Sequence, residues 1–249
     1  MTAPAPEATT ATATAYTPVV TDLMRLARVS FSPAAVYEEV RERPTFWMPW
    51  AIVAVAYTAI QLLMRPFQQR LGELMAAQAG RPTPAGAGGG AASTIIGLVA
   101  GPLTVLVICA IAAGILYVIT AALGGETTFK KMLTVTIFTW PLAILTQLLT
   151  WGVLTMRGVD SITGPTDMIV SLGVDNLLPS SVQLGHFLRF LLVGIGPIQI
   201  WSLAITAIGI SILAKASKGQ AWTVATVYFV LALLMTAGLG ALGMKMVGG

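Results

Sequence analysis

Long apolar runs alternate with short polar or glycine-rich connections along most of this chain. Five such runs are present, at residues 46–64, 94–123, 132–156, 187–213 and 221–244. About 20 predominantly apolar residues in a helix cross a hydrocarbon core of ~30 Å. The pattern therefore predicts an all-α polytopic membrane protein, with a five-transmembrane-helix bundle in a membrane domain that covers residues 46–247.

The central run, 132–156, has no charged residue, and its polar side chains recur at spacings of three and four, which places them on one helical face. The residues of this polar face are Thr136, Thr139, Gln147 and Thr150. Two functions are open for it, a polar path for a solute and a contact surface for other helices. Pro141 lacks an N–H, so we expect a kink at this point that neighbouring groups hold.

The fourth run is interrupted by Gly194-Ile195-Gly196-Pro197. Glycine and proline together predict a kink or a discontinuous helix here. Discontinuous helices can also bind a ligand with their freed backbone groups, so a ligand site is the alternative to a structural kink. The connection that precedes this run, 158–185, is expected to carry a short interfacial helix.

The residues before the first run form two segments. Residues 1–16 are rich in Ala, Thr and Pro and are predicted to be a disordered tail. Residues 17–45 are predicted to be a cytoplasmic amphipathic segment, in which Ser32-Pro33 begins a second helix. The first helix has an apolar stripe, formed by Val20, Leu23, Ala27 and Phe31. This segment is expected to lie on the membrane surface or, alternatively, to pack on the inner rim of the bundle.

Composition agrees with a membrane protein, since 56% of the residues are hydrophobic and only 10% are charged. The net charge of +4 comes from basic residues beside the apolar runs, so it gives no support to nucleic-acid binding. Eight of the 14 Lys and Arg residues fall on the side of the N-terminus and six on the other side. The positive-inside rule then predicts a cytoplasmic N-terminus and an external C-terminus.

Candidate chemistry is scarce. Cys109 is the single cysteine and lies within an apolar run, and His186 is the single histidine. Neither belongs to a recognisable nucleophile, metal or nucleotide-binding motif. The sequence therefore predicts no catalytic residue, no cofactor and no metal site.

Several short motifs, in their order and spacing, resemble the Yip (Ypt-interacting protein) family in its bacterial branch. They are Phe31-Ser32-Pro33 through Pro44, Gly124-Gly125-Glu126 with Phe129-Lys130-Lys131, Pro141, and Ile200-Trp201 through Gly209. The resemblance covers about residues 31–247. Together with the break in the fourth run, it marks the following structural positions: Pro33, Pro44, Gly124, Gly125, Pro141, Gly196, Pro197, Trp201 and Gly209.

The resemblance implies a five-span domain with a cytosolic N-terminus, in the inner (plasma) membrane of a bacterium. Eukaryotic relatives are associated with Rab-type GTPases. Such a partner is not supported here, because an Asp-Leu-Tyr-Gly-Pro element is missing and Thr139-Trp140 stands where a Gly-Tyr pair would precede Pro141. We expect a non-enzymatic membrane-organising or partner-binding module, whose partners are the lipid bilayer and a membrane protein or a second copy. The alternative is a small permease or permease subunit, which the absence of Asp, Glu and Lys from the runs disfavours.

Overall fold

The computed structural model describes residues 18–78, 80, 91–179 and 184–248. The predicted tail, 1–16, and nearly all of the glycine-rich linker 80–90 lie outside these residues. All regular elements in the described part of the chain are helical, which confirms the predicted fold class. Their bounds are α1 Pro18–Arg28, α2 Pro33–Val40, α3 Trp47–Gln78, α4 Ala91–Ala122, α5 Phe129–Arg157, η1 Val159–Ser161, η2 Pro165–Met168, η3 Val174–Leu177, α6 His186–Val193, α7 Pro197–Leu213 and α8 Lys218–Gly248.

Four of the described helices are long and apolar enough to cross a membrane, namely α3, α4, α5 and α8. The pair α6 and α7 makes a fifth candidate span if it is counted as one, with a bend of 62° between its halves. The discontinuous helix predicted at Gly194–Pro197 is thus confirmed. The residues at which the chain enters and leaves the bilayer stay predictions.

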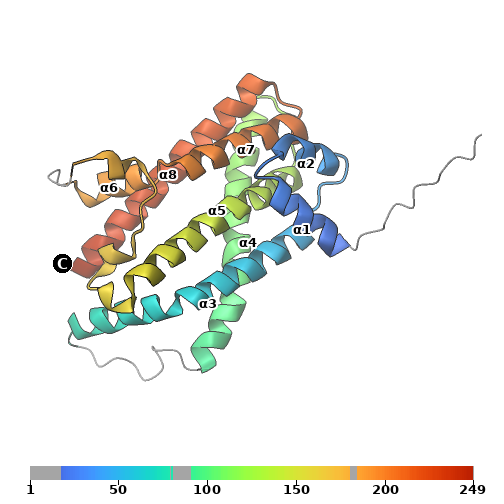
Figure 1. Ribbon diagram of the computed structural model, residues 1–249. Helices are drawn as coiled ribbons and strands as arrows, with labels where there is room; N and C mark the ends of the chain where they lie inside the picture. The colour runs from blue at the N-terminus through green and yellow to red at the C-terminus, as the bar shows by residue number, and fades with distance from the viewer. Residues whose placement is uncertain (1–17, 79, 81–90, 180–183, 249) are drawn as a thin grey trace, which may run out of the picture.

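Helix α5 lies in the middle of the bundle, between α3 and α7, and α4 crosses beside it (Figure 1). It contacts all three of these helices, and α8 packs on α4, α6 and α7. Residues 132–138 of α5, in the half that precedes the proline, are all buried, and the helix continues through Pro141 without interruption. The first part of the central run therefore lies at the centre of the core.

Helix α3 extends beyond the first apolar run, through Arg65 and Pro66, to Gln78. Met64 and Phe67 flank the proline and are buried in an apolar cluster with Leu154 and Ile162. Burial of these side chains offsets the backbone hydrogen bond that Pro66 removes, so the helix does not end there.

The two N-terminal helices lie together at one end of the bundle (Figure 1). Helix α1 contacts α3 and α5, and α2 packs on α7. The packed side carries Leu26, Val29, Val36 and Tyr37, all buried. The inner face of this segment therefore packs on the bundle, which is one of the two expected arrangements.

The outer face of α1 carries three residues of the predicted apolar stripe, and the fourth, Phe31, lies in the turn after the helix. Val20, Leu23, Ala27 and Phe31 are all exposed on the bundle, and Phe31 is the most open of them, with 87% of its surface accessible. On the other side of the helix, Arg25 pairs with Asp22 and with Glu39 of α2. The ion pairs join α1 to α2 and leave the apolar stripe directed away from the protein.

The connection 158–185, where a short interfacial helix is expected, contains three short 3₁₀ helices, η1, η2 and η3, in its described part. Local side chains bond the backbone and compete with helix formation. The carboxylate of Asp167 accepts hydrogen bonds from the backbone N–H of Thr163 and of Gly164, at 2.8 and 3.0 Å, and from the Thr163 hydroxyl. These bonds, first of all those from Thr163, lower the pKa of the Asp167 carboxyl.

Candidate functional site

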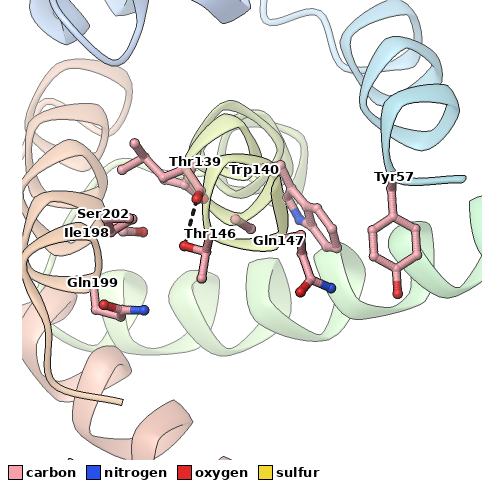
Figure 2. A pocket seen from close by; sticks show the side chains of 10 residues that line it. Tyr57, Thr139, Trp140, Thr146, Gln147, Ile198, Gln199 and Ser202 are labelled. Atoms are coloured by element: carbon pink, nitrogen blue, oxygen red, sulfur yellow. Dashed lines mark hydrogen bonds between the residues drawn. The ribbon is translucent and has the colours of Figure 1, made fainter. Parts of the chain in front are cut away.

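A cavity of about 460 Å³ lies between α3, α5 and α7. Its volume falls in the range of about 300–1,000 Å³ that is typical of ligand pockets. The lining residues come from all three helices: Tyr57, Thr139, Trp140, Leu142, Ala143, Thr146, Gln147, Ile198, Gln199 and Ser202. Figure 2 shows the α5 side chains at the centre, those of α7 on one side and Tyr57 of α3 on the other.

The cavity brings together two features that are separate in the sequence. Thr139 and Gln147 belong to the polar face of α5, and Gln199 and Ser202 belong to the first turns of α7 after the break at Gly194–Pro197. Ala143, on the same face of α5, lines the cavity and is exposed. The cavity is therefore open at the surface of the bundle, on a part of α5 that the sequence places inside the membrane.

Most threonine hydroxyls in the described helices are satisfied by their own helix. Those of Thr58, Thr146, Thr206 and Thr236 donate to the carbonyl four residues earlier, at 2.8–3.0 Å. Within the cavity wall, Thr139 likewise donates to the carbonyl of Thr136, at 2.7 Å. These hydroxyl protons are used locally, which is how polar side chains are commonly accommodated in membrane helices.

The other polar groups of the cavity are not bonded to their own helix. The phenol of Tyr57, the carboxamide of Gln147 and the hydroxyl of Ser202 have no hydrogen-bond partner within the described chain. The Oε1 atom of Gln199 is buried and also has none. An unpaired polar group inside a membrane costs free energy, so four such groups from three helices mark this cavity as a place where an external group binds.

Two aromatic rings form one wall of the cavity. Tyr57 and Trp140 pack edge to face, with ring centroids 5.6 Å apart and an interplanar angle of 89°. Aromatic pairs favour this edge-to-face geometry, and here it joins α3 to α5. The wall therefore offers apolar surface beside the unpaired amide and hydroxyl groups.

The remaining members of the polar face lie elsewhere. Thr136 is buried against α4, and its hydroxyl lies 2.9 Å from the carbonyl of Leu133 and 3.3 Å from that of Cys109. It is thus part of a helix contact. Thr150 is half-buried and does not line the cavity. Of the four residues that the sequence groups together, Thr139 and Gln147 line the cavity, Thr136 packs on α4, and Thr150 does neither.

The break between α6 and α7 is covered by the preceding connection. The backbone N–H of Val174 donates to the carbonyl of Ile195 at 2.9 Å. Gly173 lies against the carbonyls of Leu192 and Val193, and Gly196 lies against that of Leu172. A freed backbone carbonyl is thus satisfied within the chain, which is the requirement for irregular backbone in a membrane protein. The α7 polar groups without hydrogen-bond partners lie after the break, in the first turns of α7, on the cavity wall.

Three of the positions marked in the sequence dock the N-terminal segment. Trp201 donates from Nε1 to the carbonyl of Ser30, at 2.8 Å, between segments 171 positions apart in sequence. Gly209 lies against the ring of Tyr37, and Pro33 is buried at the first turn of α2. Both α7 positions therefore fit the N-terminal helices onto the bundle.

The other marked positions are structural as well. Gly124 has a positive φ of 80°, in the turn between α4 and α5. Gly125 lies against Thr120, where a Cβ would be 2.7 Å from the methyl carbon. Pro44 is half-buried between α2 and α3, Pro141 lies inside α5, and Gly196 and Pro197 cap and begin α7.

Sequence reasoning missed Tyr57, Trp140, Gln199 and Ser202 as cavity residues. Their only signal is that each is a polar or amphipathic residue in an apolar run, and helical periodicity relates positions on one helix only. Within the described residues, no group of three or more His, Cys, Asp or Glu side chains could hold a metal ion.

Comparisons with known proteins show the family of the chain. A family model, the Yip1 domain, matches residues 27–240. The chain is 28% identical over 217 residues to the "Membrane protein YknW" of Bacillus subtilis (strain 168), covering 84% of this chain and 87% of that protein. No solved structure matches it significantly. The matched range includes the docked helix α2, the central α5 and the whole cavity, and the chain belongs to the Yip1 domain family.

Proposed function

We propose that this membrane protein is non-enzymatic and acts by binding another component of the membrane through the cavity between α3, α5 and α7. The observation that carries the proposal is the set of four polar groups without partners on the cavity wall. None of the lining residues is Asp, Glu, His, Lys, Arg or Cys, so the wall offers neither a nucleophile with a base nor a proton carrier of the usual kinds. The polar groups of the wall can instead bind a partner group by hydrogen bonds.

A small permease or permease subunit is the second candidate. The observation in its favour is that Tyr57 also lines a second cavity, of about 280 Å³, between α3 and α4. Gln61 and Arg65 lie on the wall of that cavity. Polar side chains therefore line two adjoining spaces. The absence of an acidic or basic group from the larger cavity still favours a binding role over coupled transport.

A photoreactive residue at the mouth of the cavity tests the binding role. With p-benzoylphenylalanine in place of Ala143, irradiation of native membranes should yield one predominant adduct, because the exposed Cβ lies at the cavity opening. The matched control is the same residue in place of Leu149, which is exposed on α5 outside the cavity. Adducts at Leu149 should follow the bulk lipid composition. The same adduct profile at both positions would mean that the cavity recognises nothing, and the permease would then be the better candidate.

We also propose that the N-terminus is cytoplasmic and the C-terminus external, in the inner membrane of a bacterium. The basic connections on the N-terminal side support this orientation. The apolar stripe of α1 is proposed to lie in the interface of the cytoplasmic leaflet, because it is exposed while the opposite face of the helix is packed on the bundle.

Single cysteines, introduced after Cys109→Ala, test both points. An impermeant maleimide should label Ser217→Cys only from the cytoplasm and Ser161→Cys only from outside, and both serines are exposed in connections. Phe31→Cys should react with a membrane-permeant maleimide and resist the impermeant one, since lipid covers it. Labelling of Ser161→Cys from the cytoplasm would reverse the orientation, and ready labelling of Phe31→Cys by the impermeant reagent would refute the interfacial position.

A further inference from the structure

The chemical character of the cavity wall restricts what can bind there. Its lining residues carry no formal charge. A charged group that enters a membrane cavity loses its hydration, and this loss is large unless an opposite charge or a set of hydrogen bonds replaces the water. With no ion pair available from the wall, the cavity selects an uncharged group.

The hydrogen-bonding inventory restricts the occupant further. The carboxamides of Gln147 and Gln199 can each donate and accept, and so can the hydroxyls of Tyr57 and Ser202. In contrast, the hydroxyls of Thr139 and Thr146 already donate to their own helix and offer only acceptor capacity (Figure 2). A complementary group must therefore both donate and accept at several points within a small volume. Neighbouring hydroxyl groups on a compact ring meet this requirement.

The aromatic wall adds apolar surface of the right kind. The rings of Tyr57 and Trp140 stand edge to face near the carboxamide of Gln147, and the carboxamide of Gln199 lies on the other side of the cavity (Figure 2). Ligand pockets typically combine such apolar surface with a few polar groups that fix orientation. A sugar ring has this dual character, because its C–H groups are apolar and its hydroxyls lie around its edge.

The position of the opening indicates how such a group would arrive. The exposed Ala143 lines the cavity midway along α5, a helix long and apolar enough to cross a membrane. An opening at this depth faces the hydrocarbon core, so the cavity is reached from the bilayer. We infer that the cavity binds the uncharged, polyhydroxylated headgroup of a membrane amphiphile, a glycosyl lipid, and this inference rests on the binding role proposed above.

The test uses the full-length protein in nanodiscs of phosphatidylglycerol with a minor fraction of monoglucosyl diacylglycerol. Lipids that stay bound after mild detergent extraction are measured by mass spectrometry and compared with the nanodisc composition. The glucosyl lipid should be enriched several-fold in the wild-type protein. Diacylglycerol with the same acyl chains should show no enrichment, which separates headgroup recognition from binding of the tails. Free glucose, added in excess, should compete weakly, because it lacks the tails that hold a lipid at the opening.

Variants of the cavity residues test whether the glucosyl lipid is enriched by binding in the cavity. Gln147→Leu and Gln199→Leu should each reduce the enrichment about threefold, since hydrogen bonds within membranes are worth little more than half a kcal/mol each, and the double variant about tenfold. Gln68→Leu is the matched control, because Gln68 lies outside this cavity, on the wall of the second one, and bonds to Gln61. It should leave the enrichment unchanged.

Three outcomes would overturn the inference. The first is equal enrichment of diacylglycerol, and the second is equal loss in Gln68→Leu. The third is a protein as the predominant photo-adduct at position 143, which would leave the binding role intact and assign the cavity to a partner helix. An adduct profile like that at position 149 would refute the binding role itself, so the two failures are distinguishable.

Discussion

Replacing Gly209 by alanine is expected to destabilise the protein and to release its N-terminal helices. A Cβ at this position would lie 2.7 Å from Cζ and 2.9 Å from Cε2 of Tyr37. The Tyr37 ring is fully buried and packs on Phe138, with centroids 6.1 Å apart, so it has no room to withdraw. Overpacking of this kind costs about 1–3 kcal/mol, more than the 0.5–1 kcal/mol that alanine gains over glycine in a helix.

Thermal unfolding in detergent measures the loss of stability, and limited trypsin digestion at Arg41 and Arg43, between α2 and α3, measures the release of α2. Gly152→Ala is the matched control, because nothing lies within 4 Å of its added Cβ, and its stability should be unchanged or slightly raised. In a Tyr37→Leu background, Gly209→Ala should cost much less. Equal melting temperatures and equal protease resistance for Gly209→Ala and wild type would show that α2 does not depend on this contact.

Replacing Gly173 by alanine is expected to detach the connection that covers the α6–α7 break. The added Cβ would lie against the carbonyl of Leu192 and 2.6 Å from that of Val193, and backbone atoms cannot move aside as a flexible side chain can. The displaced connection would lose the bond from Val174 N–H to the Ile195 carbonyl. A buried carbonyl without its partner costs about 1–3 kcal/mol, so a loss of this size is expected.

Hydrogen exchange of the Val174 amide reports the detachment directly, and thermal unfolding reports its cost. Gly164→Ala, in the same connection, is the control, since its added Cβ meets nothing within 4 Å. Fast exchange at Val174 in Gly173→Ala alone is the expected result. Slow exchange in both variants would mean that the connection is held by other contacts, among them the one between Ser171 and Asp175.

The docking of the N-terminal segment shows what a periodic sequence pattern can predict and what it leaves open. Periodicity places Val20, Leu23, Ala27 and Phe31 on one face of a helix; all four are exposed, the first three on α1 and Phe31 in the turn that follows it. Periodicity also leaves open whether the opposite face contacts lipid or protein. Tyr37 and Gly209, and Ser30 and Trp201, decide this by close contact between segments more than 170 positions apart.

The sequence by itself determined the helical class, the apolar spans, the break at Gly194–Pro197 and the family, because these depend on local composition, on periods along one helix and on the order of short motifs. It also marked Thr139 and Gln147 as polar positions in a span. Only the tertiary structure decided that α3 continues past Pro66, that Val174 covers the break, and that Gln147 and Gln199 share a cavity with Tyr57. The physical reason is that burial, clashes and hydrogen-bond partners across helices depend on distances in space, which spacing along the chain does not contain.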